Sequence, residues 1–304
     1  MTRIRVGTCS WTDRTMAAAW YPPEVKSAEA RLRYYAERFD TVEVDSTYYG
    51  LPSERNSKLW VERTPPGFTF HVKAFGMVTR HGIKPEQLPV TLRNAYDLEL
   101  DRFGRIVHPP DDLRATVFSW FSSALTPLRE AGKLGLILLQ FPPYFTAEPR
   151  NRDYILQAAL LLAPDPVAVE FRHASWVSDE ELPHTLSFLS DHDLAYVCVD
   201  EPRLDSPTVL PPITAVTSPT AYVRFHGRNA ATWNVRGGSA ADRFKYLYSD
   251  EELAEWTAPV RRLAEEADTT YVLFNNCYSD YTPRNARQLS TLLDLHPASG
   301  WRSN

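Results

Sequence analysis

Cysteine is scarce in this chain, and its few cysteines stand far apart. Cys9, Cys198 and Cys277 are odd in number and show no metal-ligand spacing, which argues against a disulfide framework and favours a reducing compartment. The sequence also lacks a glycine-rich phosphate loop, a G-x-S-x-G elbow and a local zinc motif such as H-E-x-x-H. Common nucleotide-binding, serine-hydrolase and zinc enzymes are therefore not indicated by any short motif.

Long apolar runs and an excess of positive charge are missing as well. No window approaches the length of a membrane-spanning helix, and Met1 leads directly into the strand-like Ile4–Gly7 without an apolar signal segment. We therefore expect a cytoplasmic protein with no membrane partner. The net charge of −5 over 304 residues gives no global positive field that would favour nucleic acid. With 43% hydrophobic and 23% charged residues, the composition is that of an ordinary globular protein.

Eight short segments rich in β-branched or aromatic residues predict strands. They are Ile4–Gly7, Thr41–Val44, Phe68–Val72, Leu134–Leu139, Val167–Phe171, Ala195–Val199, Tyr222–Phe225 and Tyr271–Phe274. Segments with apolar residues at helical spacing lie between most of them, among them Leu113–Ala131 and Asp250–Ala267. Strands that alternate with helices imply a parallel sheet. Eight such units favour an α/β fold that is a single (β/α)8 TIM-like barrel over residues 1–304.

Two segments depart from this alternation. Residues 76–112 are polar and contain proline, and they follow the third predicted strand on the side where strands end. We expect this insertion to form a lid over the barrel mouth. Residues 201–220 hold five prolines and no good helical pattern, so we expect the sixth crossover to be irregular.

Four strands end in two polar residues that are one position apart. These doublets are Glu43 with Asp45, His71 with Lys73, Glu170 with Arg172, and Arg224 with His226. Alternate side chains of a strand point to opposite faces, so both members of a doublet lie on one face and the apolar residues beside them lie on the other. In a closed barrel that polar face points inward, and the carboxyl ends of the strands form the mouth where such barrels keep their active sites.

The residues that converge on this mouth divide into two predicted roles. Carboxylates and a histidine can act as general acid and base, and these candidates are Glu43, Glu170, Asp200 and His226. Cations, amides and aromatic side chains can hold a substrate, and these candidates are Trp11, Asp45, Tyr48, His71, Lys73, Gln140, Arg172, Arg224, Asn275 and Asn276. A set of buried ion pairs with no further use is the competing interpretation.

A divalent metal is considered but not favoured, and the cofactor stays unknown. Glu43, Glu170, Asp200, His71 and His226 are ligands of the kind that a divalent ion takes. However, the lysine and arginines beside them already balance their charge. Aromatic residues after the strands, such as Trp11 and Trp176, can stack on a sugar or base, or simply pack within loops.

At the same residues the chain resembles a known family, the YecE-like proteins or "domain of unknown function 72". The resemblance lies in motifs that run through nearly the whole chain in order: Val6–Thr8 with Ser10-Trp11, Thr41–Tyr49, Phe70–Ala74, Lys133–Pro143, Val169–Trp176, Tyr222–Arg228 and Phe274–Asn276. It implies a TIM-like barrel but no reaction. The stretch between Lys73 and Lys133 looks longer than is usual in that family.

The function that these observations favour is an enzyme of hydrolase or isomerase type acting on a small anionic substrate, phosphorylated or sugar-containing. Lys73, Arg172 and Arg224 would hold the anion. Two alternatives stay open: a nucleic-acid-binding or nuclease-like protein that holds a phosphodiester, and a non-catalytic protein that binds a small molecule. A glycosidase is disfavoured because the seventh strand ends in Arg224 and His226 rather than in Glu. Substrate and oligomeric state are not indicated.

Overall fold

Eight parallel strands close into a barrel in the order in which they follow one another along the chain. The structure is a computed structural model that describes residues 3–233 and 244–295. The strands are β1 (Arg3–Thr8), β2 (Thr41–Val44), β3 (Thr69–Lys73), β4 (Leu134–Gln140), β5 (Val167–Glu170), β6 (Ala195–Asp200), β7 (Thr220–Phe225) and β8 (Thr269–Phe274). The predicted (β/α)8 TIM-like barrel is therefore confirmed.

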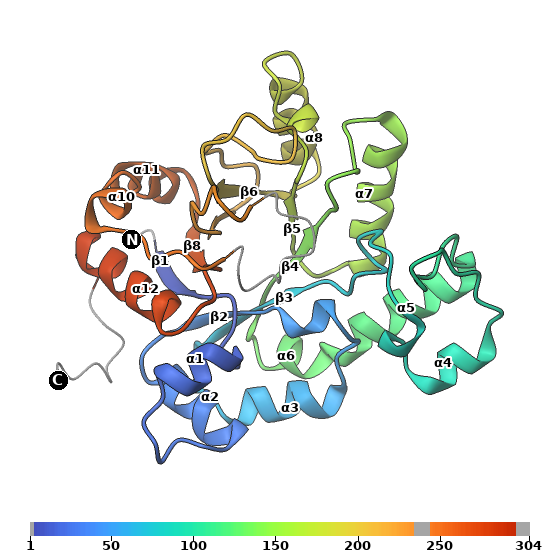
Figure 1. Cartoon of the computed structure of the whole chain (residues 1–304), viewed down its shortest axis with the longest axis horizontal. Helices are drawn as coiled ribbons and strands as arrows, with labels where there is room; N and C mark the ends of the chain where they lie inside the picture. The colour runs from blue at the N-terminus through green and yellow to red at the C-terminus, as the bar shows by residue number, and fades with distance from the viewer. Residues whose placement is uncertain (1–2, 234–243, 296–304) are drawn as a thin grey trace.

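Helices cover the outside of the strands (Figure 1). They are α1 (Arg14–Ala19), α2 (Ala28–Ala36), α3 (Glu54–Glu62), α4 (Val90–Ala95), α5 (Asp111–Ala124), α6 (Thr126–Glu130), α7 (Pro149–Leu162), α8 (Leu182–Asp191), α10 (Asp250–Ala254), α11 (Thr257–Glu266) and α12 (Tyr281–Leu292), with short 3-10 turns η1 (Ser46–Tyr48), η2 (Pro85–Gln87) and η3 (Ala174–Trp176). Serine side chains cap the first turns of α2, α3 and α10, from Ser27, Ser53 and Ser249. Within the described ranges, no helix has both the length and the hydropathy of a membrane span.

Two helices that the sequence predicts as continuous are each divided in the structure. The expected helix Leu113–Ala131 consists of α5 and α6, and Pro127 stands in the first turn of α6. The expected helix Asp250–Ala267 consists of α10 and α11, with Pro259 near the start of α11. Proline has no backbone N–H to donate to the carbonyl of the preceding turn, so it is tolerated at the start of a helix and not in its interior. The sixth crossover is irregular, as expected.

The register between strands determines which side chains face the barrel interior, because partners in parallel strands lie on the same face. Glu43 is level with His71, Gln140 with Glu170, and Val199 with Arg224. The alternate residues face the helices. Phe70, for example, lies on the outer face of β3, where its ring stacks on Trp60 of α3 at 5.9 Å. The polar doublets therefore point inward, toward the carboxyl ends of the strands.

The insertion at residues 76–112 contains η2, α4 and a single β-bridge between Leu100 and Ile106. Its start is fixed to the barrel, because Tyr154 of α7 donates a hydrogen bond to the carbonyl of Val78 at 2.8 Å, and Tyr144 donates one to Arg80 at 2.7 Å. In Figure 1, α4 lies at the outer side of α5, away from the strands. A lid role for this segment stays a prediction.

Candidate functional site

A chain of alternating charges crosses the upper interior of the barrel, and we call Glu43, Arg224, Glu170, Arg172 and Glu201 the charge ladder. Arg224 of β7 is fully buried and donates to Glu43 of β2 at 2.7 Å and to Glu170 of β5. Tyr222 also donates to Glu43, at 2.9 Å. Burial opposes ionisation of Glu170, but Arg172 and Arg224 together hold the pKa of Glu170 well below its usual range.

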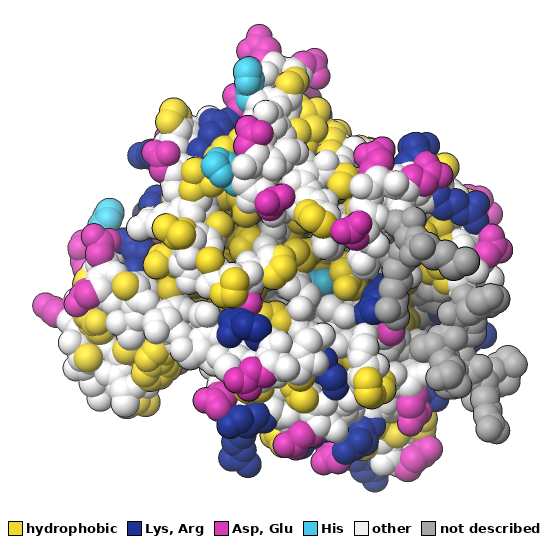
Figure 2. Space-filling model, turned by 180° about the vertical axis from the view of Figure 1, so that it is seen from behind, with side chains coloured by type: hydrophobic (Ala, Val, Ile, Leu, Met, Phe, Trp, Pro, Cys, Tyr) yellow, Lys and Arg dark blue, Asp and Glu magenta, His cyan; other side chains and the backbone are white. Residues whose placement is uncertain are grey.

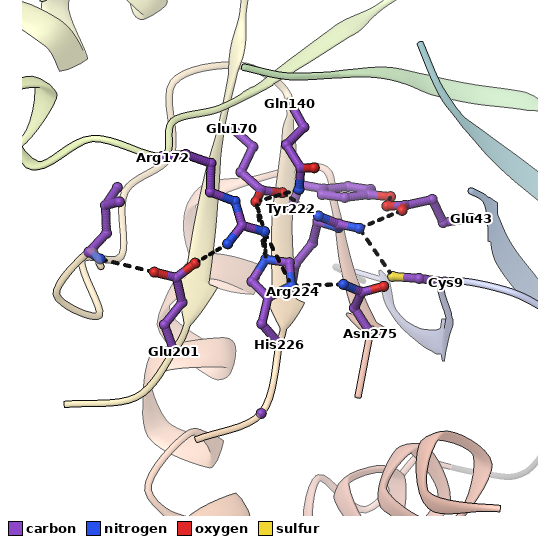
Figure 3. Close-up of polar contacts among 12 residues, drawn as sticks. Cys9, Glu43, Gln140, Glu170, Arg172, Glu201, Tyr222, Arg224, His226 and Asn275 are labelled. Carbon is purple, nitrogen blue, oxygen red and sulfur yellow. Dashed lines mark hydrogen bonds and ion pairs between the residues drawn. The ribbon is translucent and has the colours of Figure 1, made fainter. Parts of the chain in front are cut away.

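The outer end of the ladder is built around Arg172, just beyond β5. Its guanidinium contacts Glu170 at 2.6 Å and also bonds Glu201 (Figure 3). Glu201 is fully buried and accepts a second hydrogen bond, from the amide of Leu210, at 2.9 Å. Burial raises the pKa of Glu201 to about 7, although Arg172 acts to lower it. This carboxyl therefore changes its charge near neutral pH.

His226 stands beside the ladder and is held on both ring nitrogens. Its Nε2 lies 3.1 Å from Glu170 and 2.9 Å from Arg172, and its Nδ1 lies 2.9 Å from the amide of Asn275. Burial, followed by the charge of Arg172, lowers the pKa of His226 to about 3. The ring is therefore neutral. A proton on Nε2 would be donated to Glu170 and leave Nδ1 to accept from Asn275, whereas a proton on Nδ1 would leave Nε2 to accept from Arg172. Gln140 of β4 donates to Glu170 at 2.8 Å.

Lys73 and Asp45 lie above the buried charges and are partly exposed. Lys73 is the last residue of β3, and its Nζ lies 4.5 Å from the centre of the Tyr48 ring. Burial and the charge of Arg224 lower the pKa of Lys73 to about 8. Burial raises the pKa of Asp45 to about 6 despite the opposing effect of Lys73. The rim thus carries an amine and a carboxyl that both titrate close to neutral pH.

The structure brings together most of the residues that the sequence placed at the mouth. Side chains from six strand ends meet there: Glu43, Asp45, Tyr48, Lys73, Gln140, Glu170, Arg172, Arg224, His226 and Asn275. Sequence reasoning missed Glu201. The signal was present, because Ala195, Val197 and Val199 alternate on the inner face of β6 and the next inward position is 201.

The expectation that Asp200 faces the mouth is wrong. Asp200 is level with Phe225, so it lies on the outer face of the barrel. There it accepts hydrogen bonds from Arg228 at 2.8 Å, from Tyr248 at 2.8 Å and from Trp256 at 2.7 Å. Asp200 therefore anchors the segment after β7 to the helices.

Trp11 and Asn276 also turn away from the mouth, contrary to expectation. Trp11 is buried against Trp60 and Phe70, with ring centroids 5.8 and 6.1 Å apart, on the helix side of the sheet. Asn276 donates to the carbonyl of Tyr246 at 2.8 Å and to Asn285 of α12 at 2.9 Å. Asn276 follows the inward residue Asn275, so alternation sends it outward. Trp11 lies beyond the end of β1, where strand alternation no longer determines its direction.

Trp176, considered for base stacking, is also a core residue. Its ring is fully buried and stacks on Phe171 at 4.2 Å, and its indole nitrogen donates to the carbonyl of Phe145 at 2.7 Å. No face of this ring is open to a ligand.

His71 points inward but lies below the site. Its Nδ1 accepts a hydrogen bond from the amide of Leu136 at 3.0 Å, and its ring packs edge-on against Tyr222 and Tyr271 at 4.9 and 4.2 Å. Burial and Arg5 lower the pKa of His71 to about 3. It is a neutral, fully buried interior residue packed on Tyr222 and Tyr271, and this position does not support its predicted contact with substrate.

Three residues of the site have the donor atoms for a metal ion. Glu170, Glu201 and His226 offer ligand atoms that all lie within 4.8 Å of one another. The guanidinium of Arg172 already contacts all three. A divalent cation at this point would have to displace Arg172.

The comparisons with known proteins agree over nearly the full length. The family model described as "Protein of unknown function DUF72" matches residues 5–302. The UPF0759 protein YunF from Bacillus subtilis (strain 168) is 30% identical over 295 residues, which cover 96% of this chain and 95% of that protein.

Solved structures give the same result. A DUF72 family protein from Enterococcus faecalis V583 superposes with a TM-score of 0.78 at 26% identity, covering 96% of each chain. One from Thermotoga maritima MSB8 superposes with a TM-score of 0.74 at 33% identity, covering 96% of this chain and 99% of that one. With the family model, the sequence relative and these structures in agreement, the chain belongs to the DUF72 family.

Proposed function

We propose that this protein is an enzyme that acts on a small anionic substrate at the carboxyl ends of its barrel strands. The observation that carries the proposal is the charge ladder, buried directly beneath a rim with an amine and a carboxyl that titrate near neutral pH. Ionised groups are costly to bury unless each is paired. Perturbed pKa values at the open end of a barrel are typical of functional sites.

Lys73 and Arg172 are the groups that would hold the anion. Within residues 3–233 and 244–295, no carboxylate lies within 4.0 Å of the Lys73 amine. Arg172 is 12% exposed and lies at the outer end of the charge ladder. Arg224 is fully buried between Glu43 and Glu170, so it supports the site from below and does not reach a ligand. The sequence indicates that Arg224 holds the anion, whereas its buried position gives it a supporting role.

Asp45 and Glu201 are the groups that would transfer protons. A general acid or base works best when its pKa lies close to the working pH, and the pKa values of these two carboxyls are raised to about 6 and about 7. Glu170 and Glu43, in contrast, are held by Arg224. The neutral ring of His226, which is buried and contacts Glu170, Arg172 and Asn275, would position these groups rather than carry a substrate's proton.

The geometry supports hydrolysis and isomerisation equally, and it gives less support to nucleic-acid binding. The aromatic residues that would stack on bases, Trp11 and Trp176, are buried. On the face shown in Figure 2, Lys and Arg side chains alternate with Asp and Glu and form no continuous basic band outside the grey region. A cytoplasmic location stays a prediction from the cysteine usage.

Thermal unfolding in the presence of inorganic phosphate tests the anion site. We expect phosphate to raise the Tm of the wild-type protein, and a concentration of 100 times Kd would add about 2.7 kcal/mol. Lys73→Met and Arg172→Met should lose this stabilisation. Lys26→Met and Arg55→Met, at exposed positions away from the site, should keep it. If phosphate, sulfate and small carboxylates all leave the wild-type Tm unchanged, the proposal is wrong.

Turnover separates an enzyme from a binding protein. The wild-type protein should release phosphate from, or isomerise, at least one member of a panel of small sugar phosphates, and Glu201→Gln should lower that rate at least tenfold. Stabilisation by these compounds without any turnover would instead support the non-catalytic binding protein.

A further inference from the structure

In the part of the chain that the structure describes, Lys73 differs from Arg172 and Arg224 because no carboxylate contacts its charged group directly. Arg224 has two carboxylate partners and Arg172 has two. Within residues 3–233 and 244–295, the Lys73 amine forms no ion pair or hydrogen bond, and it lies over the Tyr48 ring, 4.5 Å from the ring centre. A lysine on an interior strand end would ordinarily be paired with a carboxylate.

Burial is the main factor that favours the neutral form of Lys73. The guanidinium groups of Arg224 and Arg172 also disfavour a positive amine, while Glu43 and Glu170 favour one. Asp45 and Tyr48 face it from the β2 side, and His81 faces it from the insertion. With its pKa lowered to about 8, about one Lys73 amine in ten is unprotonated at pH 7.

An unprotonated lysine next to a cation is the arrangement that makes an amine nucleophilic toward carbonyl compounds. The geometry points to Lys73 as a covalent site: its Nζ forms an imine with the aldehyde or ketone of a small substrate whose anionic group is held by Arg172. This deepens the proposed function, on which it rests, by assigning the carbonyl class of substrate and the nucleophile.

The step balances with groups that are present at the rim. The lone pair of the neutral amine attacks the carbonyl carbon, the C=O π electrons move to oxygen, and the nitrogen proton passes to that oxygen to give a carbinolamine. Asp45, whose carboxyl has a raised pKa and interacts with Lys73, supplies the proton with which the hydroxyl leaves as water. A protonated C=N bond to Lys73 and one water molecule result. No oxidant, reductant or metal is needed.

The chain offers an internal control for trapping, because it has only six lysines: Lys26, Lys58, Lys73, Lys84, Lys133 and Lys245. Wild-type protein is incubated with pyruvate, an anionic ketone, and sodium cyanoborohydride, and the reduced adduct on each lysine is measured by peptide mass spectrometry. We expect the adduct at Lys73 to exceed that at each exposed lysine, Lys26, Lys58, Lys84 and Lys245, at least tenfold. Acetone, the neutral matched ketone, should label Lys73 at least tenfold less than pyruvate does.

The imine inference and the proposed function are contradicted by different results. Equal labelling of Lys73 and the exposed lysines overturns the imine inference, and it leaves the proposed function standing if phosphate still raises the wild-type Tm. If acetone and pyruvate label Lys73 selectively and equally, the claim that the substrate is anionic is wrong. The assignment of Lys73 as the nucleophile then still stands. Lys73→Arg should abolish the selective adduct, and an adduct elsewhere in the mouth of that variant would contradict the assignment.

Discussion

The guanidinium of Arg224 on β7 lies 2.7 Å from the carboxylate of Glu43 on β2, and both groups are fully buried. They come from strands that are not neighbours in the sheet. The pair therefore spans the interior of the barrel and supports the outer part of the site from beneath. Four expected outcomes follow from this arrangement and its surroundings.

Arg224→Met should destabilise the folded protein. Removing one partner of a buried ion pair leaves the other charge uncompensated and costs about 3 to 5 kcal/mol, and here two carboxylates, Glu43 and Glu170, lose their partner. Urea denaturation measures the loss. Arg55→Met on the exposed face of α3 should change stability by less than about 0.5 kcal/mol. Equal stability of the two variants would contradict a supporting role for Arg224.

The stability of the protein should depend on Glu201 in the acidic range. The pKa of Glu201 rises from 4.5 to about 7 on folding, so the folded state binds more protons between these values. Its contribution is fully present below about pH 4.5 and is lost as the pH rises through 7, amounting to about 3 kcal/mol at most. Glu201→Gln should flatten the fall of the unfolding free energy between pH 4.5 and 7.5. Glu24→Gln, at an exposed position, should keep the wild-type slope.

Arg172→Met should create a metal site. Without the guanidinium, the ligand atoms of Glu170, Glu201 and His226 face one another within 4.8 Å, which suits a zinc ion with an open fourth position. Titration calorimetry with Zn²⁺ should show at least tenfold tighter binding to this variant than to the wild-type protein. Wild-type protein that already binds one equivalent as tightly would show that Arg172 does not exclude the metal.

Gly135→Ala should disturb the interior below the site. An added Cβ at Gly135 would lie 2.6 and 2.7 Å from the ring atoms Cε1 and Nδ1 of His71, and that ring is fixed by the amide of Leu136. Overpacking of this kind costs about 1 to 3 kcal/mol. Gly50→Ala is the matched control, since its Cβ would meet nothing within 4 Å. The two variants are compared by their denaturation midpoints in urea.

Alternation along strands makes much of this site predictable, because a residue's face follows from its position once one inward neighbour is known. Glu43, Glu170 and Arg224 follow this rule directly. Asp200 does not, because it is the first polar residue after an apolar run, and its direction depends on the register of β6 against β7. The inward direction of Glu201 follows from the register of β6, in which Val199 is level with the inward residue Arg224. Which charged side chains pair with one another depends on how distant strands pack. The sequence pattern therefore does not tell the buried, paired Arg224 from the accessible Lys73.

The charge ladder also affects how the barrel unfolds. It joins Glu43 in the first half of the chain to Arg224, Glu170 and Glu201 in the second half. If β1–β4 separated from β5–β8, Glu43 would lose the guanidinium that compensates it. Independent half-barrels are thus disfavoured, and both halves should melt in a single cooperative transition.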